Sequence, residues 1–401
     1  MDTTVEQIGA PVVAELRAAG YKESTIDQYE KTIRTLTGFV DGHGGVYTPA
    51  LGAVFASMTT SPRTGRFSAQ RRSGYGRVVR VFDTYVATGR VDLATSKRGG
   101  GGAWPGTDEF TALARLWAAD MVARGLAPAT QEAYGRVARA YLVFLESAEV
   151  RCLDDADGAS VLGFLESLSG RWAASSLFWV VSNFRPFLRF TGRTDLVDAA
   201  GLAGVKRSHR ILPVLSDDVQ ARVVHTCTSE MVSTRDAAIT LLALTTGLRA
   251  CDIIGLRLGD IDWRTATIGI VQQKTCNPLT LPLATLVRAK LADYILHERP
   301  SSVDDHVFLR SKAPHTKLAD HASIHRVIAT TFRTAGVADL KVGTSVLRHS
   351  AASRLLRAAV PLPTISAVLG HASPESTNVY LSVDQERLLE CVLPVPAGAQ
   401  P

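Results

Sequence analysis

Residues 236–264 of this 401-residue chain read DAAITLLALTTGLRACDIIGLRLGDIDWR and decide how its C-terminal half folds. The apolar run between positions 239 and 244 predicts a buried helix, which the Thr-Gly pair ending at Gly247 interrupts. A second helix should follow, with Arg249 and Asp252 on one face because they lie three residues apart. An arginine held by a carboxylate suits a phosphate, since its guanidinium donates two parallel hydrogen bonds. An ordinary Arg–Asp pair on a helix surface also explains these two residues.

A predicted hairpin follows at residues 266–283, which read ATIGIVQQKTCNPLTLPL. Residues 267–271 have strand composition, Asn277-Pro278 marks a turn, and residues 279–283 alternate again. Lys274 therefore lies near the tip of the hairpin. A lysine held close to a phosphodiester can donate a proton to a leaving alkoxide, because the pKa of its ammonium group shifts readily on desolvation. A lysine on a hairpin is more often simply solvated.

Two further stretches carry groups that suit phosphate chemistry. Residues 344–356, TSVLRHSAASRLL, predict a helix with Arg348 near its beginning, and a second arginine can help to neutralise a phosphate that carries extra negative charge. Residues 369–380 read LGHASPESTNVY. Ser373-Pro374 predicts a helix start there, with His371 just before it and Tyr380 about two turns into the helix. A tyrosine near a helix end is more often a half-buried packing residue.

Together these stretches resemble the catalytic domain of the tyrosine recombinases, also called phage-type integrases. The matching residues are TGLRACDIIGL ending at Leu256, Lys274 after Gln272-Gln273, LRH at 347–349, and LGH followed nine residues later by Tyr380. The resemblance covers roughly residues 212–385. It implies a mainly α chain with an α+β catalytic domain, preceded by two helical-bundle DNA-binding domains.

The resemblance also implies a role for each residue. Tyr380 would attack the scissile phosphate and form a 3′-phosphotyrosyl link. Arg249 and Arg348 would bind the non-bridging oxygens, and His371 would donate a hydrogen bond to the phosphate. Lys274 would protonate the departing 5′ oxygen, while Asp252 would support Arg249. No metal and no cofactor are expected, and the covalent link conserves the bond energy for rejoining.

One position departs from the family pattern. Ser345 stands three residues before Arg348, where the family usually has a histidine that receives the tyrosine proton. Either the serine hydroxyl binds the phosphate adequately, or cleavage is slower, or another group substitutes; the adjacent His349 would point in a different direction on a helix. Two alternative functions follow, a DNA-binding relative that has lost turnover and a monomeric relaxing enzyme of the type IB topoisomerase kind.

The N-terminal half contains an internal repeat. Residues recur at a spacing of 105, with Gly20, Thr25, Tyr29 and Phe39 matching Gly125, Thr130, Tyr134 and Phe144. A repeat of this length indicates a duplicated domain. Each copy shows helical periodicity, at Ile26, Tyr29, Ile33 and Leu36 in the first and at Tyr134, Val137, Tyr141 and Phe144 in the second. The extra first copy could lengthen the DNA footprint or hold neighbouring protomers.

The repeat and two linkers predict the domain boundaries. We divide the chain into a core-binding-like helical domain (1–96), a glycine-rich linker (97–107), a core-binding helical domain (108–203), a basic linker (204–213) and a catalytic domain with a C-terminal tail (214–401). The basic linker carries four candidates for phosphate contacts, namely Lys206, Arg207, His209 and Arg210. A solvated linker without DNA contacts is the alternative.

Composition agrees with this interpretation without deciding it. The formal net charge of +6 and the pI of about 9.1 fit a nucleic-acid partner. We expect the chain to bind double-stranded DNA that carries specific recombination sites and to form a homotetramer on two such sites. Accessory recombinases could be further protein partners. The biological role could be phage integration, transposition of a mobile element or chromosome resolution, and the sequence does not decide between these three. The i, i+4 pair His321 and His325 lacks a third metal ligand.

The cellular setting predicted from the sequence is cytoplasmic. The first 20 residues lack the basic and apolar blocks of a signal peptide, and no apolar run approaches the length of a membrane span. The five cysteines are odd in number and lack metal-binding spacing, which indicates reduced thiols; they are Cys152, Cys227, Cys251, Cys276 and Cys391.

Overall fold

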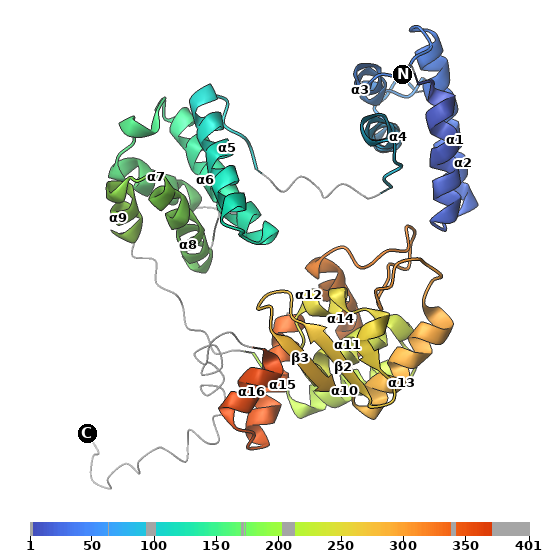
Figure 1. Ribbon diagram of the computed structural model, residues 1–401, viewed down its shortest axis with the longest axis vertical. Helices are drawn as coiled ribbons and strands as arrows, with labels where there is room; N and C mark the ends of the chain where they lie inside the picture. Colours follow the sequence, from blue (N-terminus) through green and yellow to red (C-terminus); the bar gives the residue numbers. More distant parts are fainter. Residues whose placement is uncertain are drawn as a thin grey trace. The chain divides into compact units, whose positions relative to one another are not determined.

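Figure 1 shows the computed structural model of the chain, which describes residues 3–62, 64–93, 102–169, 172, 174–202, 213–337 and 342–370. The chain divides into two compact units, one formed by residues 95–210 and the other by residues 1–94 together with 211–401. Hydrophobic residues gather in separate clusters, which fall within residues 5–93, 110–200, 215–347 and 352–369. The five-part division into domains and linkers stays a prediction.

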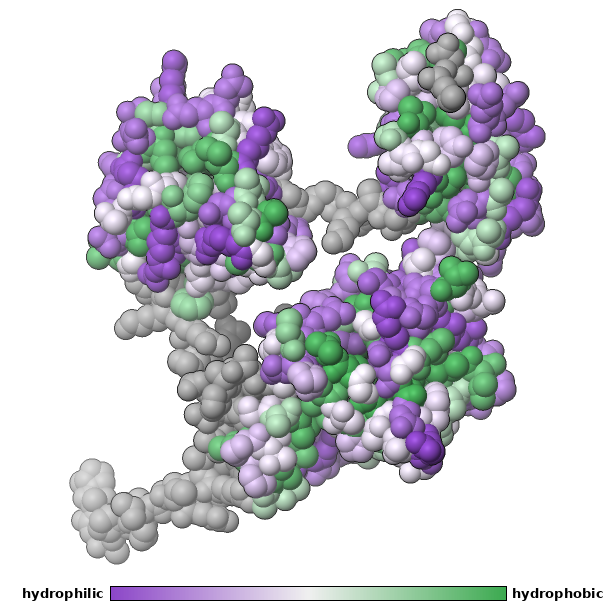
Figure 2. Space-filling model, viewed as in Figure 1, coloured by the Kyte–Doolittle hydropathy of each residue, from purple (hydrophilic) through white to green (hydrophobic). Residues whose placement is uncertain are grey.

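Residues 3–93 form a helical bundle. Its helices are α1 (Val5–Ala18), α2 (Glu23–Asp41), α3 (Pro49–Ser57) and α4 (Ala69–Thr88). Helix α2 packs against α1 and α4, and α3 packs mainly against α4. The predicted apolar face of α2 is confirmed, because Ile26, Tyr29, Ile33 and Leu36 are all buried. In the view of Figure 2, hydrophilic residues cover most of the α1–α2 side of this bundle.

Residues 102–202 form a second helical bundle. Its elements are α5 (Asp108–Ala123), α6 (Pro128–Ser147), the 3₁₀ turn η1 (Leu153–Asp155), α7 (Gly158–Ser169), α8 (Ala174–Phe190) and α9 (Thr194–Leu202). Helix α6 packs on α5 and α8, just as α2 packs on α1 and α4. Gly20 and Gly125 both adopt positive φ, 76° and 67°, directly after the first helix of each bundle. These parallels agree with a duplication, which stays a prediction.

Residues 213–370 form a mixed domain with many helices and a small sheet. Its elements are α10 (Asp217–Thr228), α11 (Thr234–Thr246), α12 (Ala250–Gly255), η2 (Leu258–Asp260), β1 (Ile261–Asp262), β2 (Thr267–Val271), β3 (Pro278–Pro282), α13 (Thr285–Asp293), the π-helical turn η3 (Tyr294–Glu298), α14 (His321–Thr334), α15 (Thr344–Arg357) and α16 (Leu362–Leu369).

Helix α11 is the centre of this domain. It contacts α10, α13, α14 and α15, and every residue from 237 to 244 is buried. The helix begins where the Ser233 hydroxyl accepts a hydrogen bond from the Asp236 N–H, and it ends at Gly247, whose φ is 66°. The predicted buried helix and its glycine stop are therefore confirmed. Because α11 is surrounded on several sides, it fixes where Arg249 begins the next helix.

The sheet confirms the predicted hairpin. Among the described residues its strand order is β1-β2-β3, and both pairings are antiparallel. Ile268 pairs with Leu281, and these two side chains are 0% and 4% exposed. Strands β2 and β3 lie side by side (Figure 1), so the turn between them carries Lys274. Within the described ranges, every helix is too short or too polar to span a bilayer.

Candidate functional site

Arg249 stands at the junction between α11 and α12. It is the residue before the first turn of α12 and has extended backbone geometry, with φ −72° and ψ 153°. Its Nη1 donates to Gln272 Oε1 at 2.9 Å, and its Nη2 donates to the carbonyl of Gly370 at 3.3 Å. These two hydrogen bonds use two of the five N–H donors of the guanidinium. The side chain is half-buried, so its remaining donors can reach a ligand at the surface.

Gln272 connects Arg249 to the hairpin and to α16. Its side chain is fully buried at 0% exposure. Besides the bond from Arg249, Oε1 accepts from the Thr275 hydroxyl at 2.8 Å, and Nε2 donates to the carbonyl of Leu369 at 3.1 Å. One amide group therefore joins the hairpin, the first arginine and the end of α16.

Arg348 lies in the second turn of α15 and is 8% exposed. Its Nη1 donates to the carbonyl of Gly247 at 2.9 Å, and its Nη2 donates to the carbonyl of Leu369 at 2.6 Å. Both acceptors are backbone carbonyls at the C-terminal ends of helices, where the helix dipole favours a cation. The guanidinium is thus held in one place by the ends of α11 and α16.

Two glycines make this arrangement possible. Gly247 and Gly370 have φ values of 66° and 62°, in the left-handed region that favours glycine. A Cβ on Gly370 would lie 2.0 Å from Gln272 Oε1, so no other residue fits beside that amide. The Thr-Gly-Leu-Arg and Leu-Gly-His stretches therefore need their glycines for both backbone geometry and space.

The predicted direct pair between Arg249 and Asp252 is wrong. Asp252 is 3% exposed, and its Oδ1 accepts from the Gln273 backbone N–H at 2.9 Å and from the Cys251 thiol at 3.7 Å. The reason is that Arg249 precedes the helix in extended geometry, so the i, i+3 rule does not bring the two side chains together. Asp252 instead fixes the start of the hairpin turn, next to the amide that binds Arg249.

Lys274 and Ser345 are both exposed. Lys274 occupies the turn between β2 and β3, two residues after Gln272. Ser345 lies in the first turn of α15, which begins at Thr344, and so stands one helical turn before Arg348. Its hydroxyl forms no hydrogen bond within the described part of the chain, so it can bind an incoming group. The roles of both residues stay predictions.

His349 is the imidazole nearest in sequence to the missing histidine. Burial, and then the neighbouring Arg348 guanidinium, hold the pKa of His349 below its ordinary value, so the ring is neutral at neutral pH. Successive residues of a helix differ by about 100° in direction, so His349, four residues after Ser345 in α15, points within about 40° of Ser345 but about 100° away from Arg348. The expectation that His349 points in a different direction therefore holds relative to Arg348 and is wrong relative to Ser345.

The other predicted site residues lie outside the described residues. They are His371, Tyr380 and the linker residues Lys206, Arg207, His209 and Arg210. His371 directly follows Gly370 in the chain, and the carbonyl of Gly370 accepts the hydrogen bond from Arg249. The described site therefore ends at the residue before the predicted histidine.

Gln272 is the functional residue that the sequence reasoning missed. In the sequence, Gln272 serves only to mark the position of Lys274 two residues later. Its signal is the period of two along the strand, since Ile268, Ile270 and Gln272 fall on one face and the first of these is fully buried. A polar residue that continues a buried apolar face must find hydrogen-bond partners, which marks it as a structural or functional amide.

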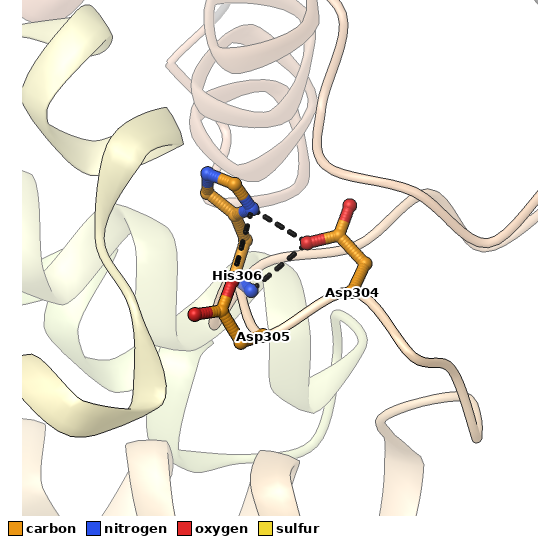
Figure 3. A group of neighbouring side chains, drawn as sticks. All are labelled: Asp304, Asp305 and His306. Carbon is orange, nitrogen blue, oxygen red and sulfur yellow. Dashed lines mark hydrogen bonds and ion pairs between the residues drawn. The ribbon is translucent and has the colours of Figure 1, made fainter.

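Asp304, Asp305 and His306 form a cluster of potential metal ligands within the described residues (Figure 3). The groups already bind one another and the surrounding loop. Asp304 accepts hydrogen bonds from the His306 ring, the His306 N–H and the Lys317 N–H, while both oxygens of Asp305 accept from Arg257 at 2.9 and 2.8 Å. These contacts explain the cluster as a clamp for the loop that follows residue 299.

Hydrogen bonding also determines the charge of Asp304. Burial alone would raise the pKa of its carboxyl group, but the hydrogen bonds from the His306 N–H, the His306 ring and the Lys317 N–H outweigh burial and lower the pKa to about 2. The carboxylate is therefore ionised at all ordinary pH values, which suits its role as a fixed acceptor within the loop.

Comparison with known proteins identifies the family. The sequence model of the phage integrase family matches residues 213–387, a range that includes Arg249, Gln272 and Arg348. The tyrosine recombinase XerC of Mesorhizobium japonicum is 32% identical over 280 residues, which cover 67% of this chain and 89% of that protein. The chain belongs to the phage integrase, or tyrosine recombinase, family.

Further relatives agree with this assignment. The putative integrase/recombinase y4rF of Sinorhizobium fredii is 33% identical over 225 residues, and this match spans 54% of the chain and about half, 53%, of that relative's length. The crystal structure of the XerH site-specific recombinase bound to palindromic difH substrate has a TM-score of 0.57. It shares 16% identity and covers 72% of this chain and 89% of XerH, so it supports the fold of this family member.

Proposed function

We propose that this family member cuts and rejoins duplex DNA at a specific site, through a covalent bond between Tyr380 and a 3′ phosphate. The observation that carries the proposal is the convergence of Arg249 and Arg348 on adjacent carbonyls, those of Gly370 and Leu369. Two guanidinium ions brought together repel each other, so their convergence is favourable when an anion binds between them. A phosphodiester is an anion that accepts several of their N–H donors at once.

The proposed reaction has one covalent step and its reversal. The Tyr380 oxygen forms a bond to phosphorus while the bond from phosphorus to the 5′ oxygen breaks. Lys274 donates a proton to that departing oxygen, and the two arginines bind the charge that accumulates on the non-bridging oxygens. The tyrosine proton passes to the solvent, since Ser345 is exposed and a serine hydroxyl is a poor base near neutral pH. Attack by a 5′ hydroxyl on the phosphotyrosine rejoins the strand without ATP.

The wider assembly is part of the proposal. Recombination between two duplexes needs four strand exchanges, so we propose a homotetramer on two sites, with accessory recombinases as further protein partners. The basic linker of Lys206, Arg207, His209 and Arg210 would contact DNA phosphates between the helical bundle and the catalytic domain.

A trapping experiment tests the reaction. The full chain is incubated with a library of nicked duplexes of random sequence, in which the nick releases a short oligonucleotide after cleavage and prevents rejoining. DNA that stays attached after denaturation is sequenced to find the preferred site. Tyr380→Phe should abolish this adduct and leave DNA affinity nearly unchanged, because only the nucleophilic hydroxyl is removed. Tyr85→Phe removes a hydroxyl from the first helical bundle and should leave the adduct unchanged.

The outcomes separate the alternatives. A persistent adduct in Tyr380→Phe would refute the assignment of the nucleophile. DNA binding by the wild-type chain without any adduct would favour the DNA-binding relative that has lost turnover through Ser345. Relaxation of supercoiled DNA without sequence preference would favour the topoisomerase-like alternative and contradict a site-specific recombinase.

A further inference from the structure

Two arginines of α15 hold the C-terminal end of α11. Arg348 donates to the carbonyl of Gly247, the residue that ends α11. Arg354 binds the last turn of the same helix, because its Nη2 donates to the carbonyl of Leu244 at 2.9 Å and to that of Thr245 at 3.4 Å. The last carbonyls of a helix have no partner within the helix, so these donors satisfy them. Arg354 therefore fixes the end of α11 against α15.

The end of α11 sets the place of both phosphate-binding arginines. Arg249 follows Gly247 by two residues, so its backbone continues from this helix. Arg348 donates directly to the carbonyl of Gly247. A shift of α11 relative to α15 would therefore change the distance between the two guanidiniums that the proposed reaction brings to one phosphate.

A buried glutamine of α10 orients Arg354. Gln220 is 8% exposed, and its Oε1 accepts from Arg354 Nη1 at 2.8 Å. Its Nε2 donates to the carbonyl of Leu215 at 3.1 Å. The arrangement repeats the one at Arg249, where the buried Gln272 accepts from the guanidinium and donates to a backbone carbonyl. Each of these two arginines is thus held in one orientation by a buried amide.

Ser350 connects the same network to the body of α15. This residue is 1% exposed, and its hydroxyl accepts from the Leu215 N–H at 2.8 Å and donates to the carbonyl of Val346 at 2.9 Å. Both backbone polar groups of Leu215 therefore bind side chains, the N–H that of Ser350 and the carbonyl that of Gln220. Helices α10, α11 and α15 are joined by hydrogen bonds that meet at Arg354.

Stability alone is a weak reason for a cation at this place. All three acceptors of Arg354 are neutral oxygens, and the side chain is half-buried. Burial of a charged group costs free energy, which neutral acceptors offset less well than a carboxylate does, although the dipole of α11 offsets part of it. What the guanidinium offers is geometry, because its planar fork binds Gln220 with one nitrogen and α11 with the other.

We propose that Arg354 is a positioning residue for strand cleavage, which holds Arg249 and Arg348 at the separation that binds the scissile phosphate. It acts through the end of α11 and not by contact with the phosphate, and Gln220 fixes its orientation. This inference rests on the proposed function and adds a residue that the proposed reaction needs. Loss of Arg354 should leave DNA binding intact, since many phosphate contacts supply affinity, but slow the step in which charge accumulates on the non-bridging oxygens.

The experiment compares the cleavage of two nicked duplexes that carry the preferred site. One has an ordinary scissile phosphate. In the other a sulfur replaces one non-bridging oxygen, and the two stereoisomers are assayed separately. Sulfur accepts hydrogen bonds poorly, so the ratio of the single-turnover rates on oxygen and on sulfur reports how well the arginines bind that oxygen. DNA affinity is measured in parallel by fluorescence anisotropy.

Arg354→Met removes the guanidinium and keeps a long side chain. It should slow cleavage of the ordinary phosphate about tenfold, less than the roughly hundredfold loss for a displacement of about 1 Å, and leave DNA affinity unchanged. The ratio of oxygen to sulfur rates should fall, because a displaced arginine loses less when sulfur replaces its oxygen. Arg357→Met is the matched control on the same helix, since the Arg357 guanidinium pairs with the exposed Asp217 at 3.3 Å. It should keep the wild-type rate and ratio.

A second pair of variants separates positioning from stability. Gln220→Leu and Gln220→Glu both remove the donor to the carbonyl of Leu215, but only Gln220→Glu keeps an acceptor for Arg354. Both changes should lower the Tm, whereas Gln220→Glu should cleave faster than Gln220→Leu and close to the wild-type rate. This comparison decides the matter even where Arg354→Met does not fold.

Each outcome supports or overturns the assignment. If Arg354→Met slows both substrates by the same factor, the arginine only stabilises the domain and the assignment is overturned. The same follows if Arg357→Met reproduces the loss, since net charge would then explain it, or if Gln220→Glu cleaves as slowly as Gln220→Leu. If the wild-type chain forms the Tyr380 adduct and Arg354→Met cleaves like it, the proposed function stands and this inference falls. If the wild-type chain forms no adduct, both fall.

Discussion

Gln272→Ala tests whether the buried amide positions the first arginine. The change removes the acceptor for Arg249 Nη1 and for the Thr275 hydroxyl, and it removes the donor to the carbonyl of Leu369. The backbone hydrogen bond from the Gln272 N–H to the carbonyl of Asn277 remains, so the hairpin itself should persist. Arg249 then keeps its hydrogen bond to the carbonyl of Gly370, but its guanidinium can rotate about that bond.

The size of the effect follows from these three hydrogen bonds. The bond from the charged guanidinium is worth about 1.5–3 kcal/mol, and each neutral bond about 0.5–1.5 kcal/mol. Their plain sum is an upper bound, because Arg249 and Thr275 are half-buried and can bind water instead. We therefore expect a loss of about 2–3 kcal/mol in the free energy of unfolding. Since a displacement of about 1 Å in a catalytic group can cost about a hundredfold in rate, cleavage should fall by about that factor.

The assay combines thermal unfolding with single-turnover cleavage of a nicked duplex that carries the preferred site. Gln273→Ala is the matched control, because the neighbouring glutamine is exposed and only its backbone N–H binds Asp252. Gln272→Glu keeps the acceptor for Arg249 but lets a carboxylate compete with the phosphate, so it should regain some stability and still cleave slowly. If Gln272→Ala cleaves at the wild-type rate, the positioning role of Gln272 is refuted.

Two further predictions concern Ser345 and Asp304. Ser345→His should keep or raise the single-turnover cleavage rate, because an imidazole one turn before Arg348 can take the tyrosine proton. Ser345→Ala should lower the rate only modestly, because the serine is exposed. A loss of about a hundredfold in the alanine variant would show that the hydroxyl has a central catalytic role. Asp304→Asn should lower the Tm at neutral pH. The pKa of Asp304 is lowered in the folded state from 3.8 to about 2, so the carboxylate contributes stability that is present above pH 3.8 and is lost as the pH falls towards 2. The Tm difference between wild type and variant should therefore shrink across that interval, and a constant difference would contradict the hydrogen-bonding account.

The sequence predicted the regular parts of the site well, because their signals are local. The buried helix that ends at Gly247, the hairpin that carries Lys274 and the helix that carries Arg348 all form as expected. Each depends on periodicity or turn chemistry within about a dozen residues, which a single sequence records directly.

The contacts between these elements could not be predicted from the sequence. The i, i+3 rule wrongly paired Arg249 with Asp252, because it presumes that both residues are already helical. The true partner, Gln272, lies 23 residues away from Arg249, and the carbonyl of Gly370 lies 121 residues away. Backbone carbonyls carry no residue identity, so no motif could have revealed that the end of α16 binds both guanidiniums.

The hydrogen bonds that join both arginines to the end of α16 couple two equilibria, the docking of α16 and the pairing of the two guanidiniums. When α16 moves away from α15 and the hairpin, Arg249 and Arg348 lose the carbonyls of Gly370 and Leu369 together. Anything that favours the docked helix therefore favours the paired guanidiniums. Thermodynamic reciprocity then requires that a phosphate bound by the pair also strengthens docking of α16, by the same factor. DNA would thus act as an effector of the C-terminal region as well as its substrate, and a protein that captured α16 would compete with DNA without touching it.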